Sequence, residues 1–468
     1  MKKILKTVSM LFLGWFLYTF IFSVLVFNVP LTATSDIAYD VEAMMSRDES
    51  VSGTYATVVD DNAFALNSRL AMIESAEEAI DISYYSIHDG YSRDVFFYAL
   101  HEAAERGVSI RIIIDGVFYP QTFRDKDALD ALTAHENVRF KLFEPYNPAL
   151  PHAIQNILHD KLMIVDDVYG MTGGRNIGDR FFKEGVEGGY SSTYDRDILI
   201  HSETGTHPTV TAMRTYYDEL FNHAYSEPYE PDTDNDHTEA LENMQAAMHA
   251  HRTEQAYTKD AVLSRIDEKK VEVENATFVH GPLNRMHKDP VVFETLCAIA
   301  ENSETWFIQS PYIVFSNLMR ERMPEYDSKD ITVLTNNMVD NTNLFAVSGY
   351  RRYREDIAAH STLYEYQGDM TIHGKTMTFD DDISVIGSFN LDPRSVSLST
   401  ESVIVVVSKD FQDSLNAVID SYLQQSLAVD TEGSYIDRES VTPAELTRGR
   451  RWLLRALSAL TYFFDPML

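Results

Sequence analysis

Cysteine is almost absent from this chain, which contains one, Cys297, among 468 residues. A single thiol excludes an intrachain disulfide. The residue lies in the apolar run Leu296-Cys297-Ala298-Ile299-Ala300, which is typical of a buried helix. We therefore expect Cys297 to have a packing role.

Basic residues are scarce relative to acidic ones. The chain has 39 lysines and arginines against 72 aspartates and glutamates, which gives a formal net charge of −33. Nucleic-acid binding depends on neutralising phosphates with cations, so such a chain should repel a nucleic-acid backbone. A nucleic-acid substrate or partner is therefore disfavoured. The acidity itself indicates a solvated surface and identifies no partner.

What the chain has instead is one polar pattern that occurs twice. The residues are His159, Lys161, Asp166, Gly173, Gly174 and Asn176, and 214 positions later His373, Lys375, Asp380, Gly387, Ser388 and Asn390. Each copy reads H-x-K-x4-D-x6-G-[GS]-x-N. With about six specified positions at roughly one in twenty each, chance gives on the order of one match in 10⁸ per start. Two copies imply two similar halves and one composite active site.

The repeated residue types suit chemistry at phosphorus. A neutral imidazole can attack phosphorus near pH 7, and a second imidazole can protonate the leaving alcohol. Two halves can place similar histidines in different environments, which is how an acid and a base are assigned. Lys161 and Lys375 would supply positive charge to the non-bridging oxygens of a phosphodiester. Asn176 and Asn390 would donate amide hydrogen bonds to the same oxygens. The scheme requires no metal and no cofactor.

The small residues of the pattern are expected to bind substrate. Gly173, Gly174 and Gly387 would let the backbone approach the substrate closely. Ser388 could add a hydroxyl contact.

Four carboxylates accompany the pattern. Asp197 and Glu401 follow the asparagine of each motif in strand-like segments, so we expect each to fix the tautomer of an imidazole. Asp166 and Asp380 belong to the pattern itself and are catalytic candidates on that ground. An aspartate at such a position more often supports a turn or a strand end than carries a proton.

Each half is expected to open with a βαβ unit. In the first half we expect helices over residues 67–79 and 95–106 and strands over 80–85 and 108–114. In the second half we expect helices over 291–302 and 318–323 and strands over 305–309 and 331–334. Each motif begins on a strand, 161–165 or 375–379, and a histidine and a lysine two residues apart share one face there.

The amino-terminal end predicts a membrane anchor. Three lysines precede an uncharged run over residues 7–29, whose 23 residues suffice to cross a hydrocarbon core of about 30 Å. A cleaved signal peptide is the alternative, but its apolar region is usually about 7 to 15 residues long. Acidic residues dominate the flank after the run, with Arg47 the only basic residue among Asp36, Asp40, Glu42, Asp48 and Glu49. We therefore expect one pass of a bacterial cell membrane, with the bulk of the chain outside the cytoplasm.

The carboxyl-terminal end runs against the acidic trend. Arg448, Arg450, Arg451 and Arg455 accompany Trp452, Leu453, Leu454, Leu457, Leu460, Tyr462, Phe463 and Phe464. Such a basic, aromatic and amphipathic segment suits an interfacial helix on anionic lipid. A terminal helix docked on the protein's own core is the alternative.

These features divide the chain into five expected segments. They are a membrane anchor and flank over residues 1–35, a first lobe over 36–225, an acidic linker and helix over 226–260, a second lobe over 261–430 and a basic amphipathic tail over 431–468.

With this duplicated motif the chain resembles the phospholipase D superfamily, whose signature the motif is. The run from Gly387 to Ser395, with Glu401 beyond it, resembles the bacterial cardiolipin synthase branch, as do Gly173-Gly174-Arg175-Asn176 and Gln309-Ser310-Pro311-Tyr312. The resemblance implies two α/β lobes related by a pseudo-twofold, a phosphohistidine intermediate and no cofactor. It also implies that His159 is the nucleophile and His373 the acid and base. One departure is Ser399, where the branch commonly has asparagine.

The expected function is therefore that of a phosphatidyltransferase acting on membrane phospholipids. The reaction would make cardiolipin from phosphatidylglycerol and a second phospholipid. A membrane-anchored phospholipase D, which gives the second step to water, is the nearest alternative. A nuclease of the same superfamily and a non-catalytic membrane scaffold are the others, and the charge and the intact motifs disfavour them. The oligomeric state is left open.

Overall fold

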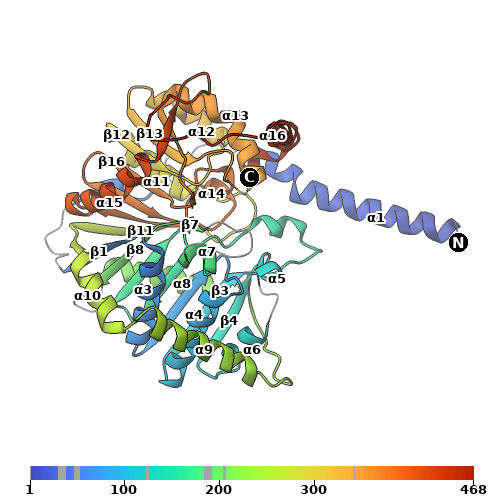
Figure 1. The fold of residues 1–468 in the computed structure, drawn as a ribbon. Coiled ribbons are helices and arrows are strands. Elements are labelled where there is room, and N and C mark those ends of the chain that lie inside the picture. Colours follow the sequence, from blue (N-terminus) through green and yellow to red (C-terminus); the bar gives the residue numbers. More distant parts are fainter. Residues whose placement is uncertain are drawn as a thin grey trace.

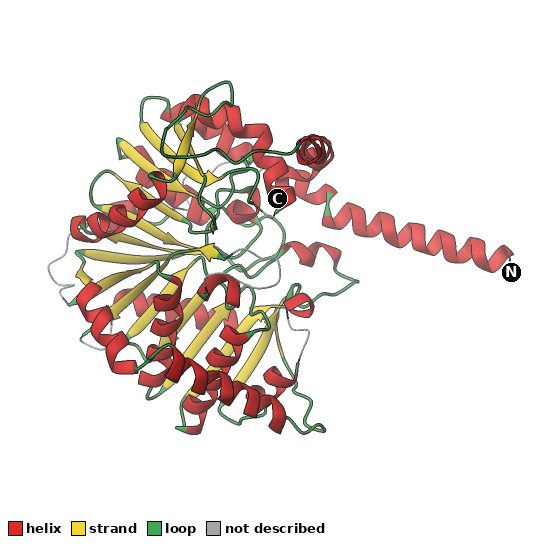
Figure 2. Ribbon diagram, viewed as in Figure 1, coloured by secondary structure: helices red, strands yellow, loops and turns green. Residues whose placement is uncertain are grey.

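Two β-sheets, one from each half of the chain, form the body of the protein in this computed structural model (Figure 1). The structure describes residues 2–29, 38–46, 53–122, 126–183, 192–203, 207–341 and 343–467. Of the acidic flank expected after the anchor, positions 36 and 47–49 lie outside these residues. Both sheets are flanked by helices, and one long helix projects away from the body (Figure 2).

The first sheet has nine strands in the order β10-β1-β8-β6-β5-β2-β3-β4-β9. They are β1 (Thr54–Val59), β2 (Ala79–Tyr84), β3 (Ser109–Asp115), β4 (Val138–Phe143), β5 (Lys161–Val165), β6 (Tyr169–Gly173), β8 (Asp197–Ser202), β9 (Ser226–Pro228) and β10 (Val271–Glu272). The neighbours β2, β3 and β4 are parallel, and every other pair is antiparallel.

The second sheet repeats this order in eight strands, β11-β18-β17-β16-β12-β13-β14-β19. They are β11 (Asn275–His280), β12 (Thr305–Gln309), β13 (Asp330–Asn336), β14 (Thr362–Tyr366), β16 (Thr376–Phe379), β17 (Ile383–Gly387), β18 (Ser402–Val407) and β19 (Ser426–Val429). Here β12, β13 and β14 are the parallel neighbours. Strand for strand, the order matches that of the first sheet without β10. The predicted fold class, two similar α/β lobes, is confirmed.

Helices cover the outer face of each sheet. On the first lobe lie α3 (Asn62–Ser75), α4 (Tyr91–Glu105), α6 (Asp127–Thr133), α9 (Thr238–Glu254) and α10 (Lys259–Lys269). On the second lie α2 (Val41–Met44), α11 (Val291–Glu301), α12 (Asn317–Arg322) and α13 (Leu344–His360). Between the sheets, α8 (Pro208–Asn222) and α15 (Lys409–Leu423) share one apolar cluster with strands of both lobes. This shared core holds the lobes together.

Shorter elements complete the chain. They are α5 (Tyr119–Thr122), α7 (Asp179–Phe182), α14 (Pro393–Ser397), β7 (Thr193–Tyr194), β15 (Thr371–Ile372) and the 3₁₀ turns η1 (Leu25–Asn28), η4 (Pro151–Gln155), η5 (Met323–Tyr326) and η6 (Tyr462–Met467).

Local sequence explains where the helices begin and end. The helix expected over residues 67–79 is α3, which begins earlier because the Asp61 carboxylate accepts a hydrogen bond from the Phe64 N–H at 2.6 Å. Helix α4 ends before Gly107, whose φ of +93° favours glycine. Cys297 is buried within α11 as expected.

Two expected boundaries between segments were wrong. The linker expected over residues 226–260 belongs to the first lobe, because β9 pairs with β4 and Met244 and Met248 of α9 are buried in that lobe's core. The second lobe does not start near Ala261, because α10 packs on the first lobe and β10 pairs with β1. It begins at β11. Conversely, α2 precedes the first lobe in sequence but packs on the second.

The amino-terminal helix α1 (Lys2–Ser23) leaves the body of the protein (Figure 1). The stretch Ile4–Asn28 is long and apolar enough to cross a membrane by length and composition, which suits a single pass. Its base is attached to the first lobe, because the Tyr18 hydroxyl donates to the carbonyl of Ala149 and the Gln155 amide to that of Ser23, each at 2.9 Å.

The carboxyl-terminal helix α16 (Arg448–Thr461) packs on α13 of the second lobe. Leu454, Ser458 and Thr461 form its buried face. On its other side, Trp452, Leu460 and Tyr462 are each about two-thirds exposed, at 69%, 66% and 67%. Next in the chain, the Phe463 ring stacks on Phe20 of α1 at 6.2 Å. The tail is therefore docked on the protein's own core, and its aromatic residues adjoin α1.

Candidate active site

Each motif folds as a β-hairpin that brings its ends together. His159 precedes β5, Asp166 occupies the turn, and Asn176 follows β6. The second copy uses β16 and β17 in the same way, with His373 before the first strand and Asn390 after the second. Because the chain runs out and back, the fixed spacing places the first and last motif residues beside each other.

Backbone pairing across the lobes joins the two motifs. The N–H of His159 donates to the carbonyl of Thr400 at 3.2 Å, and the N–H of His373 donates to the carbonyl of Tyr194 at 2.6 Å. The flanking residues form parallel bridges, Leu158 with Thr400 and Ile372 with Tyr194. Equivalent positions of the two halves thus make equivalent contacts, as a pseudo-twofold requires.

The imidazoles are held by carboxylates of the opposite lobe. Nδ1 of His159 lies 2.9 Å from a carboxylate oxygen of Glu401, and Nδ1 of His373 lies 2.6 Å from Oδ2 of Asp195. An ionised carboxylate accepts a hydrogen bond from Nδ1–H, which leaves Nε2 as the unprotonated ring nitrogen. Each motif histidine therefore takes its carboxylate partner from the other lobe.

Glu401 was predicted in this position, but the expectation for Asp197 was wrong. The Asp197 carboxylate instead accepts hydrogen bonds from buried Arg69 and Arg175 at 2.9 and 3.2 Å. Asp195, two residues earlier, contacts the histidine. Comparing the apolar runs of the two halves would have identified Asp195 from the sequence. Aligning residues 198–200 with 404–406, which have the same register in their sheets, sets Asp195 against Glu401.

Two serine hydroxyls support Glu401. Ser388 donates to Oε2 and Ser395 donates to Oε1 at 2.7 Å. Ser388, expected to support the site by touching substrate, thus acts through Glu401. Burial raises the pKa of Glu401 to about 7, opposed by the charge of Lys161 and by both hydroxyls. At Asp195, burial opposes ionisation, but the charges of His373 and Lys375 lower the pKa of the carboxyl overall.

The motif glycines serve packing and do not approach the cavity, which corrects the expected substrate contact. A Cβ on Gly173 would lie 2.2 Å from Oδ1 of Asp197, and one on Gly174 2.1 Å from Oδ1 of Asp195. A Cβ on Gly387 would lie 2.2 Å from the carbonyl oxygen of Ser402. Gly173 and Gly174 thus make room for the carboxylates of the neighbouring segment, and Gly387 makes room for the neighbouring backbone.

Asp166 and Asp380, which were catalytic candidates because of their motif positions, support turns instead. Both adopt positive φ, 44° and 48°, at the tips of the hairpins. The Asp166 carboxylate accepts hydrogen bonds from the backbone N–H groups of residues 77–79, and Asp380 from those of residues 304–305. Each therefore fixes the loop before the parallel strand β2 or β12.

The motif lysines are buried beside the histidines. Lys161 Nζ donates to the carbonyl of His159, and Lys375 Nζ lies 2.6 Å from the carbonyl and 2.8 Å from Nδ1 of His373. Burial lowers the pKa of Lys161 to about 7 and that of Lys375 to about 8. The site therefore holds positive charge that an anionic ligand would stabilise.

Both histidines are neutral at pH 7 in this environment. Burial, followed by the charge of Lys375, lowers the pKa of His373 to about 3. Burial and the charges of Lys161, Lys375 and Arg394 lower the pKa of His159 well below its usual range. A neutral imidazole is the form that can attack an electrophile.

Both histidines open onto one cavity of about 1140 Å³. Asn176 and Asn390 also line it, so the structure brings together the two histidines and two asparagines that the sequence singled out. The cavity adds residues that motif analysis missed: Tyr85, Arg180, Tyr312 and Arg394. Arg180 and Arg394 were recognisable, because each stands four residues after its motif asparagine.

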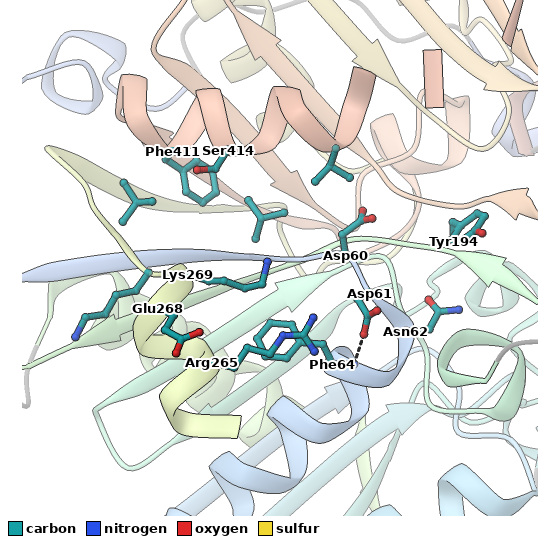
Figure 3. Close-up of a pocket in the computed structure, with 14 residues that line it drawn as sticks. Asp60, Asp61, Asn62, Phe64, Tyr194, Arg265, Glu268, Lys269, Phe411 and Ser414 are labelled. Atoms are coloured by element: carbon teal, nitrogen blue, oxygen red, sulfur yellow. Dashed lines mark hydrogen bonds between the residues drawn. The ribbon is translucent and has the colours of Figure 1, made fainter. Parts of the chain in front are cut away.

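A second cavity of about 580 Å³ lies between α10 of the first lobe and α15 of the second (Figure 3). Arg265 packs over the Phe64 ring, 4.3 Å from its centroid, and Asp61 caps α3 beside it. Among the residues that the structure describes, no motif histidine, lysine or asparagine lines this space. It has no part in the candidate active site.

Comparison with known proteins identifies the family. A family model described as "Cardiolipin synthase, PLD-like domain" matches residues 70–216 and 296–423, more than half of the chain. The chain belongs to this family of phospholipase D-like proteins.

Three individual proteins are similar to this chain over most of its length. Cardiolipin synthase C of Escherichia coli is 27% identical over 419 residues, 78% of this chain and 82% of that protein. An uncharacterised protein of Helicobacter pylori is 25% identical over 475 residues, 90% of each chain. The crystal structure of phosphatidylserine synthase from Haemophilus influenzae has the same fold, with a TM-score of 0.61 at 13% identity over 88% of this chain and 95% of that one.

Proposed function

We propose that this protein is a phosphatidyltransferase that makes cardiolipin from phosphatidylglycerol and a second phospholipid. The observation that supports this most is the crossed pairing, in which His159 with Glu401 and His373 with Asp195 open onto one cavity. Similarity to proteins named cardiolipin synthase supports the choice of lipid.

In the first step, Nε2 of His159 attacks the phosphorus of the donor phosphodiester. The P–O bond to the glycerol headgroup breaks, and His373 gives its proton to that oxygen. Glycerol leaves, and the phosphatidyl group stays on His159 as a phosphohistidine. His373 takes up this proton from water when the substrate binds, because a phosphodiester anion raises the depressed pKa of a nearby imidazole.

The two carboxylates support this assignment of roles. Asp195 is kept ionised and stabilises the imidazolium of His373, as a proton donor needs. Glu401, with a pKa of about 7, stabilises a charge on His159 less. His159 is therefore the better neutral nucleophile.

In the second step, a hydroxyl of another phospholipid attacks the phosphohistidine. His373 takes the hydroxyl proton, the P–N bond breaks, and neutral His159 is regenerated. Lys161, Lys375 and the amides of Asn176 and Asn390 stabilise the non-bridging oxygens in both steps.

Product analysis tests this proposal. Purified full-length enzyme in phosphatidylglycerol vesicles should convert lipid to cardiolipin and release one glycerol per cardiolipin formed. Mass spectrometry of the lipids measures the products. Phosphatidic acid as the main product would make the protein a hydrolase, and no lipid turnover would remove the proposal altogether.

We also propose how the protein is oriented on the membrane. Helix α1 would span the cell membrane, with both lobes outside the cytoplasm. The exposed aromatic side chains of α16 and η6 would lie in the headgroup region, because Phe463 stacks on α1 at the end nearest the body.

A double charge substitution tests the lipid contact. Trp452→Glu with Leu460→Glu should weaken binding of the protein to anionic vesicles, since both side chains are exposed and neither supports the fold. Ile436→Glu, at an exposed site away from α16, is the matched control. Equal vesicle binding by the double variant and the control would remove α16 from the membrane surface.

A further inference from the structure

The proposed mechanism leaves one tyrosine beside His159 without a role. Tyr85 follows β2, and its N–H donates to the carbonyl of Asp160, the residue between the motif histidine and lysine, at 3.0 Å. Its ring meets the His159 imidazole edge to face, with the two centroids 5.3 Å apart. Lys161 Nζ lies 5.3 Å from the centroid of the same ring. Backbone and ring therefore both fix Tyr85 against the first motif.

The Tyr85 side chain lines the catalytic cavity, and its hydroxyl is accessible there. Within the described part of the chain this hydroxyl makes no hydrogen bond, and it does not belong to the polar atoms that are both buried and unpartnered. Burial, followed by the charge of Asp115, raises the pKa of Tyr85, so the hydroxyl keeps its proton. It is therefore a neutral donor that a ligand in the cavity can reach.

The equivalent position in the second lobe lacks a hydroxyl. In each sheet the residue after the motif lysine pairs with a parallel strand, at Ser83 of β2 in the first lobe and at Gln309 of β12 in the second. Counting two residues on from each sets Tyr85 against Pro311, whose side chain has no hydrogen-bond donor. The next residue, Tyr312, has a hydroxyl that accepts a hydrogen bond from the amide of the motif asparagine at 3.4 Å. One side of the cavity therefore has a hydroxyl that the other lacks at the same place.

A phosphatidyl group on His159 brings its non-bridging oxygens to the side of the cavity that Tyr85 lines. Preorganised donors aimed at such oxygens stabilise the charge that they carry during transfer. We propose that the Tyr85 hydroxyl donates a hydrogen bond to a non-bridging oxygen of the phosphatidyl group while this group is transferred to and from His159. Tyr85 is then a catalytic residue in both steps. This inference rests on the proposed function.

The hydroxyl adds to what the motif lysine supplies. Burial lowers the pKa of Lys161 to about 7, and its ammonium also donates to the carbonyl of His159. The charge of this lysine is therefore lost as the pH rises through neutrality, when no ligand stabilises it. The Tyr85 hydroxyl remains a donor over the same pH range, because burial raises its pKa.

Tyr85→Phe removes the hydroxyl and keeps the ring against His159. The full-length variant in phosphatidylglycerol vesicles should lose roughly 10- to 100-fold in kcat for cardiolipin formation, the size of one hydrogen bond to a charged oxygen. KM should change by less than about threefold, because the hydrogen bond acts mainly in the transition state. Tyr146→Phe removes a hydroxyl from a side chain that is 55% exposed and outside the cavity, and this control should keep the unaltered rate.

Sulfur substitution separates direct contact from positioning. A p-nitrophenyl phosphodiester is prepared with sulfur in place of either non-bridging oxygen, because sulfur accepts hydrogen bonds only weakly. The rate of p-nitrophenolate release is compared with that of the oxygen diester. For one of the two stereoisomers, the oxygen-to-sulfur rate ratio should be smaller in Tyr85→Phe than in the unaltered protein, since the variant has no hydrogen bond to lose. Equal ratios for both stereoisomers would overturn the contact.

The remaining outcomes are separable. An unchanged kcat in Tyr85→Phe, with cardiolipin still formed, would overturn the role of Tyr85 alone. Absence of cardiolipin with the unaltered protein would instead overturn the proposed function, and the sulfur ratios would still test the hydroxyl. Calorimetry should give Tyr85→Phe the melting temperature of the unaltered protein. A lower one would show that the hydroxyl supports the fold and would count against an accessible donor.

Discussion

The two lobes share one strand order but differ at the residue behind each catalytic carboxylate. In the first lobe Gly174 faces Asp195, whose pKa is held low by His373 and Lys375. In the second lobe Ser388 donates to Glu401, whose pKa burial raises to about 7. A duplicated scaffold supplies two similar imidazoles, and small differences in their surroundings shift the pKa values of their partner carboxylates in opposite directions.

The largest expected effect separates the two histidines. With a diester whose leaving group is p-nitrophenolate, the first step needs no acid. His373→Ala should therefore retain a burst of p-nitrophenolate but lose at least about 10³-fold in turnover of lipid, whereas His159→Ala should lose both. Stopped-flow absorbance measures the burst. A burst in His159→Ala but not in His373→Ala would reverse the assignment.

The next effect compares the carboxylates. Asp195→Asn should lower kcat/KM for lipid on the order of 100-fold, because it removes the ionised partner of the proton donor. Glu401→Gln should lower it about tenfold, because a carboxyl with a pKa of about 7 contributes less charge. Lipid assays at pH 7.5 measure both. Equal losses of kcat/KM in the two variants would mean that Asp195 and Glu401 contribute equally to catalysis.

The close contact at Gly174 predicts a loss of stability. Gly174→Ala would place a Cβ 2.1 Å from Asp195, so the strand or the carboxylate must shift. The melting temperature should fall by about 2–4 °C, as expected for about 1 kcal/mol of strain. Gly449→Ala is the matched control, since no atom lies within 4 Å of its added Cβ. Calorimetry that finds the same midpoint for both variants would contradict the packing role.

The smallest effect is expected for Ser388→Gly, which gives the second motif the glycine that the first motif has at Gly174. The Ser388 hydroxyl lowers the pKa of Glu401, so Ser388→Gly should raise it. Activity that needs ionised Glu401 falls as the pH falls through this pKa. The acidic limb of the pH–kcat profile, near pH 7, should therefore move to higher pH in Ser388→Gly. Activity that rises as the pH falls through this pKa would show instead that the protonated carboxyl is the active form.

The repeated motif predicted two similar lobes and the histidines and asparagines that line one cavity, and apolar periodicity predicted the βαβ units. The distances from His159 to Asp166 and Asn176 match one strand, a turn and the returning strand, and both hairpins have this form. Repetition then predicted the second lobe. Pairing across the lobes was not predictable from either motif alone, because it depends on how the two sheets stack.

The errors have physical causes. Asp197 was chosen because it follows Asn176 in a strand-like segment, but the segment between them differs in length from its counterpart before Glu401. Matching the apolar runs would have identified Asp195. The segment 226–260 has the composition of a linker, yet its few apolar side chains, Met244 and Met248, are buried in the first lobe. Average polarity hides a narrow buried face.

The exchange of carboxylates between lobes has a consequence during synthesis of the chain. A ribosome that has completed the first lobe has made His159 but not Glu401, which lies 242 residues further on. In the proposed topology α1 already holds the half-made chain beside a membrane, yet the His159 imidazole still lacks its partner carboxylate. Under the proposed function, reactivity toward lipid would therefore begin only when translation is nearly complete, and unfinished polypeptides would not cleave the lipids of the bilayer.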